Sequence, residues 1–309
     1  MAIISKTGVS RLKVLVTGAN GFIGKHLVQR LISNGYSVIA FDKKKGNIGT
    51  EFVQGDIVSF NFEEILEGVN VVFHLAGLLG TTELFHRVIE AEKVNVMGTL
   101  NLLESMRKND IEKLVFTSKP NMWKYNVYTI TKENCERYLK MYQKIYDFKI
   151  VITRPFNVYG PCEYLSEYRK AIPYFIVAAL RNEELEIFGD GEQTMDPIYV
   201  DDAVEALMRC AEKLPKETVD IGSSEPVKVK DLAEKTIKLT GSKSKIVHKP
   251  IRRGEIGPKY ICANNNMEHL LGFMPRVKLG EGLKMTIKWY REHLNEFEEI
   301  YTFRDEDFL

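Results

Sequence analysis

Hydrophobic residues in the first half of the chain form short runs that alternate with longer amphipathic stretches. Residues 12–18, LKVLVTG, are rich in β-branched side chains and end in glycine, as buried parallel strands do. Residues 24–35 repeat apolar positions three and four apart, which indicates a helix. The same criteria predict strands at 37–42, 71–77, 113–118 and 149–155 and long helices at 84–109 and 126–146. This alternation predicts an α/β fold, a doubly wound parallel sheet of the Rossmann type.

Beyond about residue 160 the alternation becomes irregular. The pattern predicts helices at 172–182 and 231–241 and a strand running into a turn at 186–191. We expect residues 1–160 to form the sheet domain and residues 161–309 to form a smaller α/β lobe that binds substrate over the sheet edge. Residues 200–223 are expected to return to the first domain.

Composition narrows the class of protein. The 309 residues are 44% hydrophobic, enough for a large core, and their formal net charge is +1. That balance argues against a nucleic-acid partner held by bulk electrostatics. The four cysteines form no CxxC pair, which indicates reduced thiols and no metal site. Without a signal-like N-terminus or an apolar run of bilayer length, we expect a soluble cytoplasmic protein with no membrane partner.

A glycine-rich turn, TGANGFIG at 17–24, joins the first strand to the first helix. Gly18 suits the tight turn, Gly21 allows close backbone approach to a pyrophosphate, and Gly24 allows close helix–strand packing. The helix N-terminus would face the negative charge. The turn therefore predicts a dinucleotide site.

Asp42 ends the second predicted strand, 18 residues after Gly24. A carboxylate there accepts hydrogen bonds from the ribose hydroxyls of the adenosine and repels a 2′-phosphate. This favours NAD over NADP, although Lys43, Lys44 and Lys45 could soften the repulsion.

Several ordered motifs carry a family resemblance over about residues 12–292. They are TGANGFIG, GDI (55–57), HLAG (74–77), VNVMGTLNLLE (94–104), RPFNVYGP (154–161), GDGEQTMDPIYVDD (189–202) and RRGE (252–255). In order and spacing the chain resembles the extended short-chain dehydrogenase/reductase superfamily, specifically its nucleotide-sugar epimerases and dehydratases. The resemblance implies tightly held NAD, which takes a hydride from a sugar carbon to give a 4-keto sugar.

The resemblance also implies which residues hold the cofactor. Asp56 would contact adenine, HLAG would line the pyrophosphate and ribose, and Asn95 would steady the central sheet. The implied cofactor-binding residues are Gly18, Asn20, Gly21, Phe22, Ile23, Gly24, Asp42, Asp56, Ile57, Leu75, Ala76, Gly77, Asn95, Tyr128, Lys132, Pro155 and Phe156.

The catalytic pair implied by the resemblance is Tyr128, the general base, and Lys132, which binds the nicotinamide ribose. Their spacing of four places both on one helix face. A Lys ammonium about 4 Å from the phenol, at an effective dielectric of ~20, would supply on the order of 4 kcal/mol. That would lower a Tyr pKa by about 3 units. We therefore expect Lys132, with the cationic nicotinamide, to set the charge of Tyr128.

Lys119 departs from the family pattern, because it stands in FTSKPNMWK where the family places its catalytic Ser or Thr. When protonated it could donate to a sugar oxygen or a phosphate. It could equally point to solvent, with Thr117 or Ser118 taking over the role. Both alternatives remain open from the sequence.

A second set of residues is implied to bind the nucleotide part of the substrate. Asn157 and Arg252 would contact the diphosphate, and Phe188 would pack against the base. Met195 replaces a family Arg, so Lys170, Lys119 or a neighbouring Arg would have to supply the missing charge. The implied substrate-binding residues are Asn157, Lys170, Glu186, Phe188, Met195, Arg252 and Glu255.

The departures favour one reaction. The family's 4,6-dehydratases carry an Asp–Glu pair after the catalytic Thr, and SKPNMWK contains no acid. We therefore expect C4 epimerisation of a UDP-hexose, with a dehydratase or 4-ketoreductase as the alternative and a non-catalytic NAD-bound scaffold as a third. The helices at 84–109 and 126–146 resemble those that pair in the family's homodimers, so we expect a homodimer.

Overall fold

Seven parallel strands form one central sheet in the computed structural model, which describes residues 11–297 except 47, 121, 167 and 253–258. Their order across the sheet is β11-β6-β5-β4-β1-β2-β3. The order reverses between β1 and β4, and ligands of such sheets bind beyond the carboxyl ends of the strands at that point. The strands are β1 (Lys13–Thr17), β2 (Ser37–Asp42), β3 (Glu51–Gln54), β4 (Val71–His74), β5 (Lys113–Thr117), β6 (Lys149–Pro155) and β11 (Val219–Ile221). The predicted fold class is confirmed.

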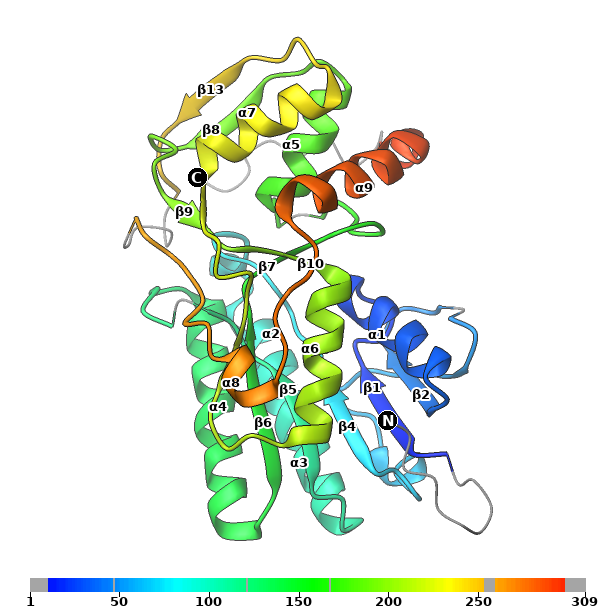
Figure 1. The fold of residues 1–309 in the computed structure, drawn as a ribbon. Helices are drawn as coiled ribbons and strands as arrows, with labels where there is room; N and C mark the ends of the chain where they lie inside the picture. The colour runs from blue at the N-terminus through cyan, green and yellow to red at the C-terminus, as the bar shows by residue number, and fades with distance from the viewer. Residues whose placement is uncertain (1–10, 47, 121, 167, 253–258, 298–309) are drawn as a thin grey trace.

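Helices cover both faces of this sheet (Figure 1). Successive residues of a strand point to opposite faces. Val14 and Val16 accordingly join the core under α1 (Phe22–Ser33) and α6 (Val200–Lys213), whereas Leu15 joins the core under α3 (Gly98–Lys108) and α4 (Val127–Tyr146). Burial on both faces explains why the strands read as continuous apolar runs.

The helix predicted at 84–109 is divided into four pieces. They are the 3-10 turn η2 (Glu83–His86), α2 (Val88–Ala91), the π-helical turn η3 (Glu92–Met97) and α3. Gly98 begins α3 against Ile57, where a Cβ would lie 2.6 Å from the Ile57 side chain. The π-helical turn contains Asn95, whose side chain bonds a neighbouring loop, and such turns often occur at functional sites.

The C-terminal part forms a second lobe at the carboxyl edge of the sheet (Figure 1). Its helices are α5 (Ala171–Leu180), α7 (Val229–Thr240) and α9 (Leu279–Glu292), which share one core with the α1–α6 face of the sheet. Strands pair as β7 (Asn157–Tyr159) with β10 (Pro197–Tyr199), β8 (Leu185–Phe188) with β13 (Ile246–Lys249), and β9 (Thr194–Met195) with β12 (Val227–Lys228). The short elements are η1 (Phe62–Glu64), α8 (Met267–Leu271) and η4 (Leu294–Phe297).

The chain crosses between the two parts more than once. α6 follows β10 back onto the sheet, and β11 then pairs with β6 as an edge strand, so Val219 lies beside Thr153. Residues from the second half of the sequence therefore form part of the central sheet and of the helical layer on it. The domain boundary near residue 160 stays a prediction.

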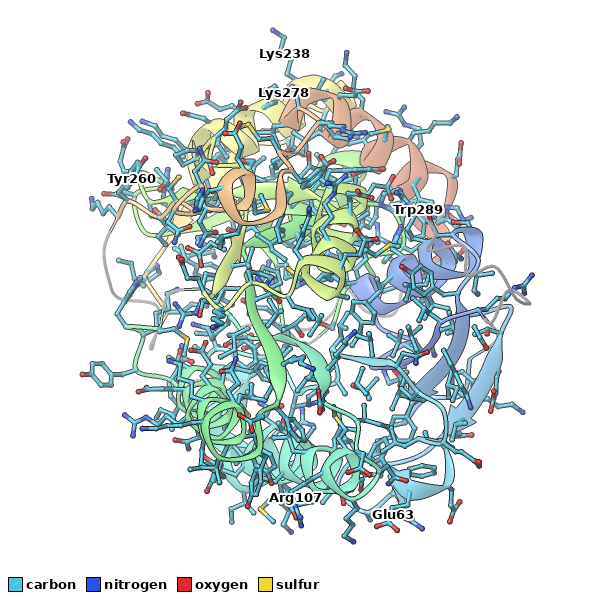
Figure 2. All side chains as sticks on the ribbon, turned by 60° about the horizontal axis from the view of Figure 1, so that its bottom comes forward. Glu63, Arg107, Lys238, Tyr260, Lys278 and Trp289 are labelled. Atoms are coloured by element: carbon cyan, nitrogen blue, oxygen red, sulfur yellow. The ribbon has the colours of Figure 1, made fainter. Side chains whose placement is uncertain are left out.

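Charged side chains are distributed around the outside of the molecule (Figure 2). Glu63 and Arg107 project at one end, and Lys238 and Lys278 at the other. In the described part of the chain, every helix is too short or too polar to cross a membrane.

Candidate active site

The glycine-rich turn lies between β1 and α1. Gly18 adopts φ +71°, and a Cβ there would lie 2.7 Å from the Ala76 backbone nitrogen. A Cβ at Gly24 would lie 2.1 Å from the Gly18 carbonyl oxygen. Gly21 precedes α1 and brings no side chain to cap its first N–H groups. This turn presents a close backbone and the positive end of a helix, which is what a pyrophosphate requires.

Asp42 is fixed beside this turn. Its Oδ2 accepts from the Asn20 N–H at 3.0 Å and its Oδ1 from the Lys44 N–H at 2.9 Å. Each carboxylate oxygen keeps a further lone pair, so the group can still accept from ribose hydroxyls. Lys43 Nζ pairs with Asp56 Oδ2 at 2.9 Å, and the hydrogen bond from the Val58 N–H, followed by that from Lys43, lowers the pKa of Asp56. The charge of Lys43 therefore offsets that of Asp56 and not that of Asp42.

We expect the wild type to bind NAD well ahead of NADP, because the Asp42 carboxylate repels a 2′-phosphate. Asp42→Ala should narrow the gap between the two affinities, since it removes both the ribose acceptor and the repelling charge. Fluorescence titration of the stripped protein with each cofactor measures the gap. Equal affinities in the wild type would contradict the role given to Asp42.

His74, the first residue of the HLAG motif, is buried and has a structural role that the sequence did not predict. Its Nδ1 hydrogen bonds with Thr17 Oγ1 at 2.7 Å and its Nε2 with Thr99 Oγ1 at 2.9 Å. Burial, and secondarily Lys132, lower the pKa of His74 to about 3, so the ring is neutral. His74 thus ties β1 and β4 to α3 directly beneath the glycine-rich turn. The sequence signal that could have indicated this role is a polar residue, His74, at the end of the otherwise apolar run VVFH.

Asn95 bonds a loop and a helix. Its Oδ1 accepts from the Leu78 N–H at 2.7 Å, and its Nδ2 donates to the Leu78 carbonyl at 3.1 Å and to Thr131 Oγ1 at 3.0 Å. These bonds fix the loop after β4, including Gly77, against α4. Asn95 was predicted to steady the central sheet. Its hydrogen bonds instead join the loop after β4 to α4.

Tyr128 and Lys132 lie in the first turns of α4. The helix begins after Asn126, whose Oδ1 accepts from the Thr129 N–H at 2.9 Å. Lys132 is buried, and its Nζ donates to the Thr117 carbonyl at 2.8 Å, at the end of β5. A Cβ at Gly77 would lie 3.4 Å from that Nζ. The Lys ammonium is thereby held at the carboxyl edge of the sheet.

The expected charge control of Tyr128 by Lys132 included the cationic nicotinamide and stays a prediction, whereas the protein chain alone shows the effect of burial. Burial raises the pKa of Tyr128 above its ordinary value, with a smaller contribution from Tyr168. The Lys132 Nζ lies 5.9 Å from the Tyr128 ring centroid and is engaged by Thr117. Burial therefore disfavours the phenolate, and positive charges near the phenol must offset this cost before Tyr128 can ionise.

Thr117 and Ser118 are both used inside the structure. The Thr117 hydroxyl donates to the His74 carbonyl at 3.1 Å, and the Ser118 hydroxyl donates to Glu136 Oε1 at 2.7 Å. Arg154 also donates two hydrogen bonds to Glu136, from Nε to Oε1 at 3.1 Å and from Nη2 to Oε2 at 2.7 Å. The alternative in which Thr117 or Ser118 replaces the family's catalytic hydroxyl stays a prediction, and these two donated bonds would have to change for either hydroxyl to donate to a sugar. Glu136, which the sequence analysis missed, falls one helical turn after Lys132.

Lys119 follows β5 and is only partly exposed. Its Nζ donates to the Pro120 carbonyl at 2.7 Å. Burial lowers the pKa of Lys119 to about 7, helped by the positive charges of Lys124 and Arg154 and opposed by Glu136. Unlike an ordinary Lys, this amine can exchange a proton near neutral pH.

The residues predicted to bind substrate divide into two groups. Arg252 lies over the Phe188 ring, 4.7 Å from its centroid, and its Nη1 is 3.7 Å from Glu83 Oε1. Asn157 is exposed and its Oδ1 accepts from the Asp196 N–H at 3.3 Å. These three side chains remain candidates for the nucleotide.

The other predicted substrate residues are engaged elsewhere. Lys170 pairs with buried Glu163 at 2.6 Å, so it is not available to replace the missing Arg without breaking a buried pair. Glu186 pairs with Arg169 at 3.1 Å and with Lys249 at 3.4 Å. Met195 pairs with Val227 between β9 and β12 and packs on the core. Glu255 lies outside the described residues.

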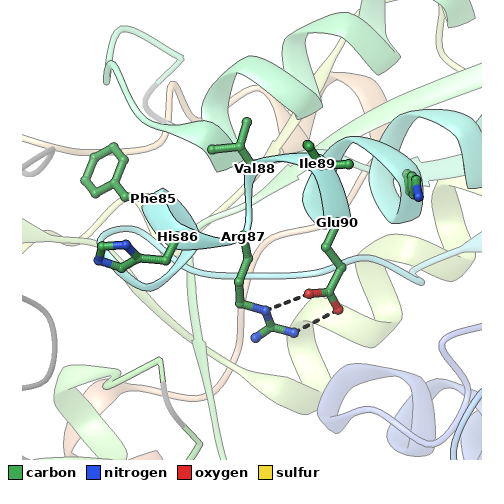
Figure 3. A pocket seen from close by; sticks show the side chains of 7 residues that line it. Phe85, His86, Arg87, Val88, Ile89 and Glu90 are labelled. Carbon is green, nitrogen blue, oxygen red and sulfur yellow. Dashed lines mark hydrogen bonds and ion pairs between the residues drawn. The ribbon is translucent and has the colours of Figure 1, made fainter.

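A separate surface hollow of about 510 Å³ lies along η2 and α2 (Figure 3). It is lined by Phe85, His86, Arg87, Val88, Ile89, Glu90 and Lys93, and Arg87 and Glu90 pair along it. None of the predicted cofactor or substrate residues lines this hollow. It therefore belongs to the outer surface of the helices and not to the site described above.

A parallel sheet with a glycine turn at its switch point and a Tyr–Lys pair beyond β5 defines a dinucleotide-binding enzyme of the extended short-chain dehydrogenase/reductase class. The chain belongs to the NAD-dependent epimerase/dehydratase family, whose model matches residues 14–222. NAD is accordingly its cofactor. The residues of the turn fit it, because Gly18 and Gly24 let the turn pack closely on the loop after β4 and on itself, where a Cβ would collide with backbone, and α1 begins at the turn with no side-chain cap on its first N–H groups.

Relatives agree in fold and differ in reaction. The UDP-glucose 4-epimerase of Thermotoga maritima, solved with UDP-glucose, is 32% identical with a TM-score of 0.86, covering 92% of this chain and 100% of that one. The UDP-glucuronic acid 4-epimerase of Bacillus cereus, solved with its substrate and NAD, is 28% identical with a TM-score of 0.84, covering 91% and 100%. The human dTDP-D-glucose 4,6-dehydratase is 31% identical over 327 residues, 93% of this chain and 92% of the relative. The family thus establishes an enzyme acting on nucleotide sugars.

Proposed function

We propose that this protein is an NAD-dependent nucleotide-sugar 4-epimerase that acts on a UDP-hexose through a 4-keto sugar. The observation that supports this most is the Tyr128–Lys132 pair in the first turns of α4, joined to β5 by the segment 119–125, which contains no acid. Epimerases solved with UDP-sugars are among the structural relatives. A dehydratase or 4-ketoreductase is the alternative, since the human relative is a dehydratase.

The chain's own residues have distinct tasks in this reaction. When bound, NAD supplies the hydride acceptor and a positive charge near the phenol. Tyr128 takes the proton of the sugar O4 hydroxyl through Oη as the C4–O bond becomes a carbonyl, and it returns that proton after the sugar has turned over. Lys132 fixes the strand end through the Thr117 carbonyl and stabilises the negative phenolate. The raised pKa of Tyr128 means that the phenolate forms only when these positive charges surround it.

The absence of acids after β5 separates the two reactions. A 4,6-dehydratase must remove a proton from C5 and protonate the leaving hydroxyl at C6, which requires an acid and a base beyond the tyrosine. Residues 119–125, KPNMWKY, supply cations and aromatic rings instead. Epimerisation requires only the removal and return of hydrogen at C4.

Incubation of the purified protein with UDP-, dTDP- and GDP-sugars, followed by NMR, tests the proposal. We expect a UDP-hexose to approach an equilibrium mixture of its two C4 epimers. A 6-deoxy-4-keto product would support the dehydratase alternative. No product from any sugar would contradict both.

Lys119 should contribute to turnover as a proton donor and acceptor at the sugar oxygen, where the family uses a hydroxyl. Lys119→Ala should lower kcat by about one to two decades, the effect of losing a charge-assisted hydrogen bond. Because the pKa of Lys119 is about 7, the amine is charged below that pH and neutral above it. The wild-type rate should therefore show an ionisation near pH 7 that the variant lacks. Unchanged rates and pH profile would place the side chain in solvent.

We expect a homodimer to form through α4 together with α2 and η3. Exposed apolar side chains gather there, including Ile89 (72% exposed), Met97 (55%) and Ile145 (61%). α4 packs directly on α2 and η3, so these residues lie on adjoining elements. We expect Met97→Lys to shift the mass measured by light scattering toward a monomer. Met274→Lys, at a residue 46% exposed just after α8, which packs on α6 and β11, should leave the mass unchanged.

A further inference from the structure

Glu83 contacts Arg252 between the sheet domain and the C-terminal lobe. Arg252 Nη1 and Glu83 Oε1 are 3.7 Å apart, and the side chains are 14% and 5% exposed. The other Glu83 oxygen, Oε2, accepts from the Thr81 N–H at 2.7 Å. Glu83 begins η2 directly after this loop, and Arg252 follows β13. A nearly buried carboxylate thus stands opposite the guanidinium predicted to grip a diphosphate.

The surroundings of both residues fix their positions. Arg252 lies over Phe188, and the pairing of Lys249 with Phe188 brings β13 and β8 together just before it. On the other side, Leu84 is fully buried in a small cluster that Tyr128 packs against. The Glu83–Arg252 pair therefore joins the platform for the nucleotide to the loop that packs beside the catalytic tyrosine.

A diphosphate and the Glu83 carboxylate compete for the same guanidinium. A charge this poorly exposed requires an opposite charge nearby, and among the described residues Glu83 is one that supplies it. The separation of 3.7 Å exceeds the usual N–H···O range of about 2.7–3.2 Å, so this is an ion pair without a close hydrogen bond. Phosphate oxygens can make the close, forked bonds that Glu83 does not make here. When a diphosphate binds, the nearby carboxylate repels it.

We infer that Glu83 is a resident counter-anion of the nucleotide site: it holds Arg252 until the substrate's diphosphate replaces it, and it thereby limits the affinity for the nucleotide. This inference rests on the proposed function, because it takes a nucleotide diphosphate as the ligand of Arg252. Beyond the proposed function, it assigns to Glu83 the role of weakening the binding of the nucleotide before reaction.

Calorimetric titration of the NAD-loaded enzyme with UDP tests the inference. Glu83→Gln keeps the size and removes the charge, and we expect it to bind UDP about three- to tenfold more tightly. Arg252→Ala should bind UDP about ten- to a hundredfold more weakly. Glu90→Gln is the matched control, because Glu90 forms an exposed ion pair with Arg87 on α2, 2.8 Å apart, and should leave the affinity unchanged.

The outcomes separate this inference from the proposed function. If Arg252→Ala binds UDP more weakly but Glu83→Gln binds it as tightly as the wild type or less tightly, the proposed replacement of Glu83 by the diphosphate is overturned. Glu83 would then be a residue that positions Arg252. Unchanged binding by Arg252→Ala would instead move the diphosphate site itself. If Glu83→Gln does not fold, Glu83→Asp decides: its shorter carboxylate should also bind UDP more tightly than the wild type, and equal or weaker binding overturns the exchange.

Discussion

Replacing Tyr128 with Phe should abolish turnover while NAD remains bound. The substitution removes only the hydroxyl that takes the sugar proton, and a positioned general base contributes about two to four decades in rate. Lys132 still donates to the Thr117 carbonyl and the glycine-rich turn is unchanged, so the cofactor site persists. Rate measurement by NMR with the same UDP-sugar, and quantification of NAD released on denaturation, give the two readouts.

Tyr125→Phe is the matched control for this variant. Tyr125 precedes Tyr128 by three residues and is 91% exposed, so loss of its hydroxyl should change neither the rate nor the NAD content. Full activity in Tyr128→Phe would overturn the catalytic role of this stretch. Loss of NAD together with activity would show that the phenol is required for cofactor binding instead.

Gly24→Ala should release the cofactor. Its new Cβ would lie 2.1 Å from the Gly18 carbonyl oxygen and 2.9 Å from the Ala19 Cα, and backbone atoms cannot move aside as a side chain tip can. The turn must therefore open, at a cost of about 1–3 kcal/mol for overpacking of this kind. We expect NAD affinity to fall by about tenfold or more, since 1.4 kcal/mol is a factor of ten.

Gly280→Ala controls for the general effect of adding a methyl group. Gly280 lies in α9, where a Cβ meets nothing within 4 Å, and alanine favours a helix over glycine. That variant should keep its NAD and melt no lower than the wild type. Undiminished NAD binding by Gly24→Ala would contradict the packing role of this glycine.

The sheet and the glycine-rich turn were predictable because local sequence specifies them. Short apolar runs rich in β-branched residues and ended by glycine, such as LKVLVTG, favour a strand buried on both faces, and a glycine is required wherever a Cβ would collide with backbone. The position of Tyr128 and Lys132 on one face follows from a spacing of four residues on a helix. These features depend on neighbours in sequence.

Features that depend on distant contacts were not predictable in the same way. The Ser118 hydroxyl donates to Glu136, and Glu83 meets Arg252, only because the fold brings separate elements together. The helix predicted at 84–109 contains a π-helical turn where Asn95 reaches Leu78, a contact between separate elements. The raised pKa of Tyr128 required knowledge of its burial, because burial disfavours the phenolate and only the structure shows how deeply the side chain is buried.

The fate of the C4 hydrogen tests the central proposal most directly. We would incubate the NAD-loaded enzyme with UDP-glucose deuterated at C4 and follow the label by deuterium and proton NMR. Epimerisation removes this hydrogen from C4 and returns it to the opposite face of the same carbon, so we predict UDP-galactose that keeps the deuterium at C4. Deuterium at C6 of a 6-deoxy-4-keto sugar, which dehydration requires because water leaves from C5 and C6, would contradict the epimerase.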